Sequence, residues 1–278
     1  SGASVSMMDL SVEAEAFGSA IRFDRMEVPA VKNSIVPDED AARKLEVPSI
    51  GAGRTGIYLS AIEKAVRCID DRPVFAGMIG PFSLAGRLLG VSEALLYCYD
   101  EPGLVRIVME KATRFLAEYA LAYKKTGAAG VVIAEPLTGL LSPRLAEEFS
   151  HPFVKNIIDA VQDDDFLVIY HNCGDSAPMM IDSLVRMGAR AYHFGNKTNM
   201  AEIMRQLPEG VYGMGNVDPS SQFRNGTPQS IYSNTTDLLT ECCRYKNFII
   251  SSGCDIPPAT PWENIDAFFS AVSDFYNC

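Results

Sequence analysis

Two short apolar runs of this 278-residue chain end close to side chains that could share one metal ion. His171 and Cys173 follow the run FLVIY, and Cys254 comes shortly after the run FIISS, much later in the chain. An imidazole nitrogen and two thiolate sulfurs form a donor set that zinc favours. Because three protein ligands leave one tetrahedral position open, the set is typical of catalytic rather than structural zinc.

The spacing of the first two candidates fits this interpretation. His171 and Cys173 are two residues apart, so an extended backbone places both side chains on the same face. The alternative is a hydrogen-bonded core histidine with two unreactive thiols, because free cysteine often packs as a small hydrophobic residue. Spacing alone leaves both interpretations open.

Seven apolar segments are predicted to be the strands that position these side chains. They are rich in Val, Ile, Tyr and Phe, as expected of parallel strands that are buried on both faces. The predicted strands cover residues 5–9, 74–80, 130–135, 166–171, 189–193, 211–215 and 248–252.

Helical periodicity of about 3.6 residues fills most of the intervening sequence. Ser142-Pro143 and Thr260-Pro261 are typical helix starts, with Pro in the first turn. Gly127, Gly188 and Gly210 stand where C-terminal caps are expected. The predicted helices cover residues 82–98, 102–126, 143–161, 177–187, 198–206, 227–244 and 261–276.

Alternating strands and helices predict an α/β fold, and specifically a (β/α)₈ TIM-type barrel made of one domain, residues 1–278. Seven of the eight units are visible, and an open doubly wound sheet is the alternative. Residues 20–73 show no clean strand and are predicted to hold an inserted loop and helix. The Gly-rich stretch 51–56 follows no evident strand, so we interpret it as a loop rather than a phosphate-binding turn.

Polar side chains collect where the predicted strands end, which is where a TIM-type barrel builds its active site. This observation strengthens the metal-site hypothesis more than any single residue does. The strand-end residues are Asp9, Glu135, His171, Cys173, Asp175, His193, Asn196, Asn216, Asp218, Cys254 and Asp255.

We predict that Glu135, Asp175 and His193 take part in the chemistry. Glu135 is a fourth metal ligand, a proton donor or a substrate contact, or else a carboxylate bonded to loop amides. Asp175 is placed to orient His171. His193 lines the site or lies in the core.

Asn216 and Asp218 belong to the segment GNVDP and are predicted to contact a cofactor. Asp218 precedes a proline, which is also ordinary turn chemistry. A structural role for Asp218 therefore stays open.

The composition of the chain excludes some classes of function. A net charge of −11, from 24 basic and 35 acidic residues, argues against broad nucleic-acid binding. No apolar run reaches the roughly 20 residues that span a bilayer, and no signal peptide is visible. Seven cysteines in a chain of this length suit a reducing cytoplasm better than a disulfide framework.

Six segments of the chain resemble the uroporphyrinogen decarboxylase superfamily, and within it the corrinoid-dependent branch similar to methylcobalamin:coenzyme M methyltransferases. They are MMDLSVEAEAFGSAI, GMIGPFSLAGRLLG, AEPLTGLLSP, HNCGD, GNVDP and SSGCDIPPATPWENI. The pairing of HNCGD with SSGCDIP is the most specific element. In the methyltransferases the matching His and two Cys bind zinc, which implies zinc at His171, Cys173 and Cys254.

The resemblance implies a zinc-dependent methyltransferase of one-carbon metabolism. It implies methyl transfer between a corrinoid and a small thiol or another small molecule. No cobalamin-binding motif is present, so the corrinoid is expected on a separate partner protein. The methyl donor and acceptor, the direction of transfer and the oligomeric state, a homodimer included, stay open.

The chain departs from the family in two respects. The arginine-bearing segment with which true decarboxylases hold substrate carboxylates has no match here, which argues against porphyrinogen decarboxylation. The family's N-terminal segment is expected to be missing, which leaves a barrel without catalytic activity as a hypothesis. A decarboxylase acting on a tetrapyrrole would use arginines of the early segment, namely Arg22, Arg25 and Arg54. A barrel that binds a corrinoid or a partner without turnover is the third hypothesis.

Overall fold

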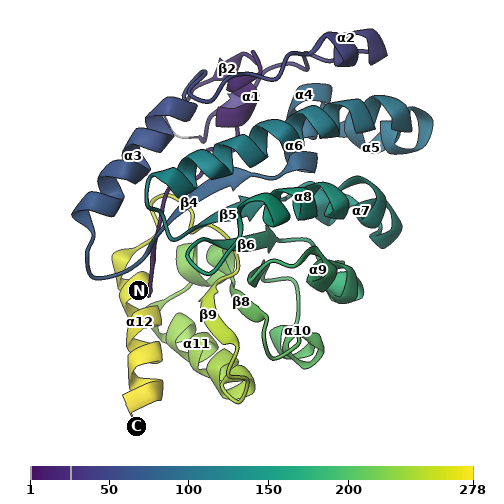
Figure 1. Ribbon diagram of the computed structural model, residues 1–278. Helices are drawn as coiled ribbons and strands as arrows, with labels where there is room; N and C mark the ends of the chain where they lie inside the picture. Colours follow the sequence, from purple (N-terminus) through teal and green to yellow (C-terminus); the bar gives the residue numbers. More distant parts are fainter. Residues whose placement is uncertain (1, 26, 278) are drawn as a thin grey trace. The chain divides into compact units, whose positions relative to one another are not determined.

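The computed structural model describes residues 2–25 and 27–277, which form two compact units. The first unit holds the chain up to residue 170 together with residues 186–189, and the second holds residues 171–185 and 190 onward. Figure 1 follows the chain from purple to yellow. The single domain predicted from the sequence stays a prediction.

Buried parallel strands form the centre of the first unit. β1 (Ser4–Val5) pairs with β4 (Val74–Ile79), and β4 pairs with β5 (Gly130–Ala134), both in parallel. The first residues of β6 (Leu167–Asn172) lie beside β5, because the Leu167 amide donates to the Ala129 carbonyl at 2.9 Å. Every residue of β4 and β5 is buried, which explains their continuous apolar sequence.

The helices of the first unit largely follow the predicted ranges. Two predicted helices are each divided in two: Gly90, with a φ of 103°, separates α4 from α5, and Ser150 separates α7 from α8. The long helix α6 packs against α4 and α8. The helices are α1 (Val12–Ala16), α2 (Glu39–Lys44), α3 (Thr55–Cys68), α4 (Pro81–Leu89), α5 (Val91–Asp100), α6 (Pro102–Lys125), α7 (Pro143–Phe149) and α8 (His151–Val161), with the short turn η1 (Thr138–Leu140).

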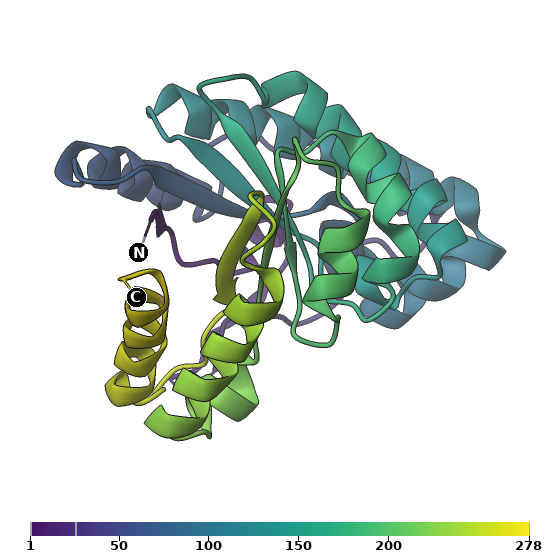
Figure 2. The ribbon, with the colours of Figure 1, turned by 90° about the horizontal axis from the view of Figure 1, so that it is seen from below.

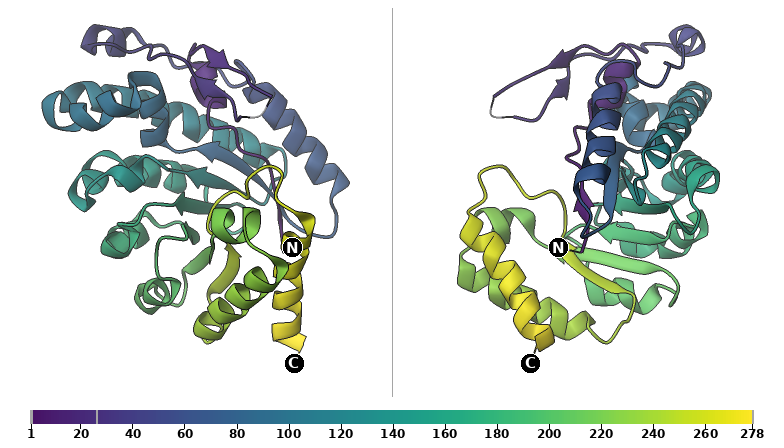
Figure 3. Two further views of the ribbon diagram at one scale, coloured as in Figure 1. Left: turned by 180° about the vertical axis from the view of Figure 1, so that it is seen from behind. Right: turned by 60° about the vertical axis from the view of Figure 1, so that its left-hand side comes forward.

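The early segment, predicted to hold a loop and a helix, contains the two helices α2 and α3 and a hairpin. A small antiparallel hairpin, β2 (Ile21–Arg22) with β3 (Ala30–Val31), lies in the stretch where no strand was predicted (Figure 3). Two residues per strand are too few to produce a recognisable alternation of polar and apolar residues. In the Gly-rich stretch 51–56, residues 51–54 form a turn, as predicted, and Thr55 and Gly56 already belong to α3.

The second unit repeats the same architecture. β7 (Ala191–Phe194), β8 (Tyr212–Val217) and β9 (Phe248–Ser252) pair in parallel in that order. Helices α11 and α12 lie side by side over a core of Val217, Phe223, Ile231 and Phe268 (Figure 2). The helical elements are η2 (Ala177–Met180), α9 (Ile181–Met187), α10 (Met200–Gln206), η3 (Pro219–Arg224), α11 (Pro228–Cys242) and α12 (Trp262–Asn277).

The strand–helix succession in both units is that of a TIM-type α/β barrel fold. Within the described residues, seven parallel strands occur at the seven places that the sequence predicted, with ends displaced by a few residues. In the same part of the chain, no helix combines the length and the apolar character needed to cross a membrane.

Candidate metal centre

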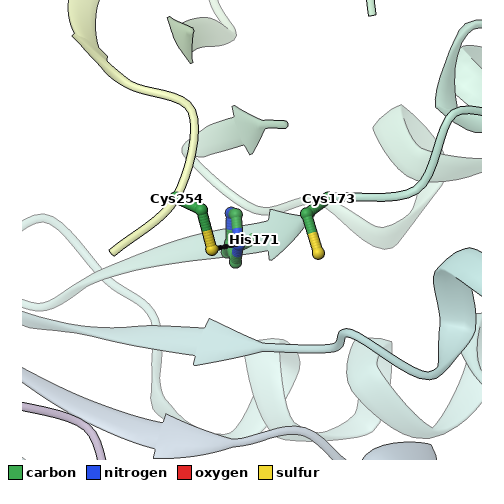
Figure 4. Close-up of side chains that lie close together, drawn as sticks. All are labelled: His171, Cys173 and Cys254. Atoms are coloured by element: carbon green, nitrogen blue, oxygen red, sulfur yellow. Dashed lines mark hydrogen bonds between the residues drawn. The ribbon is translucent and has the colours of Figure 1, made fainter. Parts of the chain in front are cut away.

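Three donor side chains of the second unit come together from two segments of the chain. His171 lies near the end of β6, Cys173 directly follows that strand, and Cys254 stands two residues beyond the end of β9. Figure 4 shows the two thiols on either side of the His171 ring. Within the described ranges, these three residues form the group of potential ligands whose spacing could hold a metal ion.

The donor geometry fits zinc. The Sγ atom of Cys254 lies 3.6 Å from Nε2 of His171, and all three donor atoms lie within 4.8 Å of one another. Tetrahedral zinc with Zn–S near 2.3 Å and Zn–N near 2.0 Å separates sulfur from nitrogen by about 3.5 Å. His171 is 6 % exposed and both cysteines are half-buried, so the site is sheltered but reachable.

A backbone carbonyl prepares the histidine for metal binding. Nδ1 of His171 lies 3.2 Å from the carbonyl oxygen of His193. Because a carbonyl can only accept, Nδ1 must carry the proton in this hydrogen bond. Nε2 therefore presents its lone pair toward the Cys254 thiol, which is the tautomer that a metal requires.

The two thiols of the cluster influence each other's ionisation. A hydrogen bond from the Cys254 thiol lowers the pKa of Cys173 to about 6, against the opposing effect of burial. The same bond raises the pKa of Cys254 to about 12. One thiolate therefore forms readily in this pair, and a bound cation would favour the second.

Two glycines that the sequence analysis did not single out shape the cluster. A Cβ atom on Gly195 would lie 2.7 Å from Cα of Cys173, and one on Gly253 would lie 2.5 Å from the amide nitrogen of Asn196. Side chains at either position would displace the backbone that carries a thiol. The sequence signalled these glycines only by their positions. Gly195 directly follows His193-Phe194, and Gly253 directly precedes Cys254.

Asp175 and His193, the other two residues predicted to act near the cluster, lie in different environments. Asp175 is exposed, and the carbonyl of His193 takes the place at Nδ1 of His171 where Asp175 was expected. The His193 ring lies beside His171, with centroids 4.6 Å apart. Chemical roles for Asp175 and His193 stay predictions.

Asn216 and Asp218 hold the loops that follow β7 and β8. The Asn216 amide donates to the carbonyls of Gly195 and Thr198 at 2.9 and 2.8 Å. Asp218 accepts from the Ser220 and Ser221 amides. Partial burial acts to raise the pKa of its carboxyl, but these and other hydrogen bonds together lower it below its usual value. Both residues also line a polar cavity of about 260 Å³, and cofactor contact there stays a prediction.

Glu135, in the first unit, is fully engaged in hydrogen bonds. Its carboxylate accepts from the amides of Phe82 and Ser83, at the start of α4, and from the hydroxyls of Ser83 and Thr138. Complete burial raises its pKa to about 7, against these bonds. The arrangement matches the loop-bonded alternative from the sequence, and a role in chemistry stays a prediction.

A second set of charges in the first unit surrounds Arg54. Its guanidinium pairs with Asp9 and Glu15 and donates to the Ser11 hydroxyl at 2.9 Å. Glu13 nearby is fully buried, and burial raises its pKa to about 7. The decarboxylase hypothesis requires Arg54 to hold a substrate carboxylate. Because Arg54 is already paired with two carboxylates, it is poorly suited to that role.

Comparison with known families gives a match over nearly the whole chain. The family model described as uroporphyrinogen decarboxylase (URO-D) matches residues 3–275. The methylcobamide:CoM methyltransferase MtbA of Methanosarcina acetivorans is 25% identical over 272 residues, which cover 96% of this chain and 78% of that protein. A uroporphyrinogen decarboxylase of Coxiella burnetii is 24% identical over 291 residues, covering 98% and 77%.

A solved structure has the same fold. The structure of a methyltransferase from Methanosarcina mazei superimposes with a TM-score of 0.89 at 23% sequence identity, over 99% of this chain and 81% of that one. The TIM-type α/β fold predicted from the sequence is thus confirmed, and so is the resemblance to the family.

Proposed function

This chain belongs to the uroporphyrinogen decarboxylase (URO-D) family, and from that premise we propose that it is a zinc-dependent methyltransferase acting with a corrinoid. The methyl group moves between methylcobalamin on a separate protein and a small thiol. The observation that carries the proposal is the cluster of His171, Cys173 and Cys254. Similarity to a methylcobamide:CoM methyltransferase supports it.

The residues of the cluster have distinct tasks in this proposal. His171, with its proton on Nδ1, offers Nε2 to the metal. Cys173 and Cys254 offer sulfur, and their charge would partly neutralise the cation. Zinc, when bound, would lower the pKa of a substrate thiol at the open position and keep its sulfur nucleophilic at neutral pH.

The electrons of the proposed transfer balance on the cobalt of the methylcobalamin substrate. The new S–C bond forms as the Co–C bond breaks, and the thiol proton leaves to solvent. Both electrons of the Co–C bond stay on cobalt, which passes from Co(III) to Co(I). The chain's own contribution is to hold the thiol and to exclude competing water from a half-buried site. The described cysteines are free thiols, which suits the reducing cytoplasm that we propose as the location.

The test combines metal analysis with a transfer assay. The purified chain is expected to hold about one zinc ion per molecule and to demethylate methylcobalamin in the presence of CoM or another small thiol. Cys173→Ala and Cys254→Ala should lose both zinc and transfer. Cys243→Ser, which replaces an exposed thiol at the end of α11, is the matched control and should lose neither.

Two outcomes would contradict the proposal. One is full zinc retention in both alanine variants. The other is turnover of a tetrapyrrole carboxylate by zinc-free protein, which would favour the decarboxylase function named for the Coxiella burnetii relative.

A further inference from the structure

His193 lies against the metal-binding residues without belonging to their donor set. Its ring is 4.6 Å from the His171 ring, centroid to centroid, with the planes tilted by 35°. The potential ligands are His171, Cys173 and Cys254 alone among the residues that the structure describes. A second imidazole in this position calls for an explanation.

The hydrogen bonds of the His193 ring run to β9. Its Nε2 lies 2.7 Å from the carbonyl oxygen of Ser252 and 3.0 Å from the hydroxyl of Ser251. The carbonyl can only accept, so Nε2 carries the proton and donates it to Ser252. Nε2 of His193 is therefore engaged with the backbone and offers no lone pair to a metal.

These bonds cross a whole strand. In the sheet of this unit, β8 lies between β7, which carries His193, and β9, which carries Ser252. The backbone ladder therefore links β7 to β9 only through β8, and the His193 side chain makes a direct second link. Ser252 is two residues before Cys254, and the Gly253 amide between them is held by the Val217 carbonyl at 2.8 Å.

We propose that His193 is a positioning residue that keeps the two ligand-bearing segments in register, a role that rests on the proposed zinc function. Its backbone carbonyl orients His171 at the end of β6. Its Nε2–H holds the segment that presents Cys254. One residue thus fixes a nitrogen donor and a sulfur donor that come from distant parts of the chain.

Two variants separate the parts of the His193 side chain. His193→Phe keeps a planar ring but removes the donor, and His193→Gln keeps an N–H donor near the position of Nε2. Neither removes the backbone carbonyl that orients His171. Ser251→Ala is the matched control, because it removes the neighbouring hydroxyl and leaves the Ser252 carbonyl in place.

Zinc affinity and the absorption spectrum of the cobalt(II)-substituted full chain are the measurements. His193→Phe should weaken zinc binding by about 10- to 100-fold and alter the cobalt spectrum. His193→Gln and Ser251→Ala should stay within about threefold of the unaltered protein. Thermal unfolding of the metal-free variants identifies any general loss of folding.

The imidazole nitrogens of the metal-free protein supply an independent readout. The chain has three histidines, so their ¹⁵N signals can be assigned by single replacements. His193 should be protonated at Nε2 and His171 at Nδ1. The opposite tautomer at His193, wild-type zinc affinity in His193→Phe, or equal losses in the Phe and Gln variants would overturn the inference alone. An unaltered protein that binds no zinc would overturn the proposed function first.

Discussion

Two sets of strand-end polar residues, one in each unit, have opposite relations to their surroundings. In the first unit, Glu135 accepts four hydrogen bonds, and Arg54 is held by ion pairs with Asp9 and Glu15. In the second unit, the donor atoms of His171, Cys173 and Cys254 lie within 4.8 Å of one another. The two sets therefore differ in how far neighbouring groups already engage their polar atoms.

The sharpest test of this contrast removes the sulfur donors. Replacing Cys173 and Cys254 together by Ser should lower zinc affinity by at least about 1,000-fold, which corresponds to roughly 4 kcal/mol. Isothermal titration or competition with a chelator measures the loss. If both units supply metal ligands, the Glu135→Gln variant would show a comparable loss, and we expect none.

A second experiment changes Glu135 in the first unit and measures the stability of the protein. Glu135→Ala should lower the free energy of unfolding by about 3–5 kcal/mol, because two amides and two hydroxyls lose a buried acceptor. Urea denaturation measures the change, and the zinc content should be unaffected. If the Glu135→Ala variant stays fully stable but loses zinc, Glu135 is a metal ligand rather than a structural residue, and the contrast between the two units fails.

A buried histidine of the first unit should make stability depend on pH. Burial lowers the pKa of His151 from about 6.5 to about 4, and neither ring nitrogen has a hydrogen-bond partner in the part of the chain that the structure describes. Between those pH values only the unfolded chain takes up the proton, so stability present above pH 6.5 is lost as the pH falls toward 4, by up to about 3 kcal/mol. His151→Leu should flatten this part of the urea-denaturation profile, and an unchanged profile would contradict the prediction.

A steric change should weaken the metal centre without removing any donor. Gly195→Ala places a methyl group against the backbone of Cys173 and should lower zinc affinity by about 10- to 100-fold. Gly210→Ala is the control, because its Cβ would meet no atom within 4 Å. Equal affinities in the two variants would mean that the Cys173 backbone adjusts freely.

The smallest effect is expected at the charged cluster of the first unit. Arg54→Met leaves Asp9 and Glu15 without their partner and should cost about 1–2 kcal/mol of stability. Zinc binding should not change. The loss should shrink at high salt, where repulsion between the two half-buried carboxylates is screened, and denaturation in two salt concentrations checks this.

Much of the fold could be predicted because strands and helices leave short-range patterns. The run at residues 248–252 became β9 with the predicted bounds, since its consecutive apolar residues Phe248, Ile249 and Ile250 are a local pattern. The hairpin of β2 and β3 was missed, because two-residue strands have no periodicity to detect. Gly90 and Ser150 divided predicted helices at points where the apolar pattern itself continues.

By itself, the sequence determined the donor types, the two-residue spacing of His171 and Cys173, and the family. Only the tertiary structure decided which groups surround each strand-end residue. It brought Cys254 to His171 across 83 residues, gave the His193 carbonyl to Nδ1 of His171, and placed Glu135 against the start of α4. The reason is physical: periodicity is encoded within a few residues, whereas the occupation of a lone pair depends on donors that distant segments bring alongside.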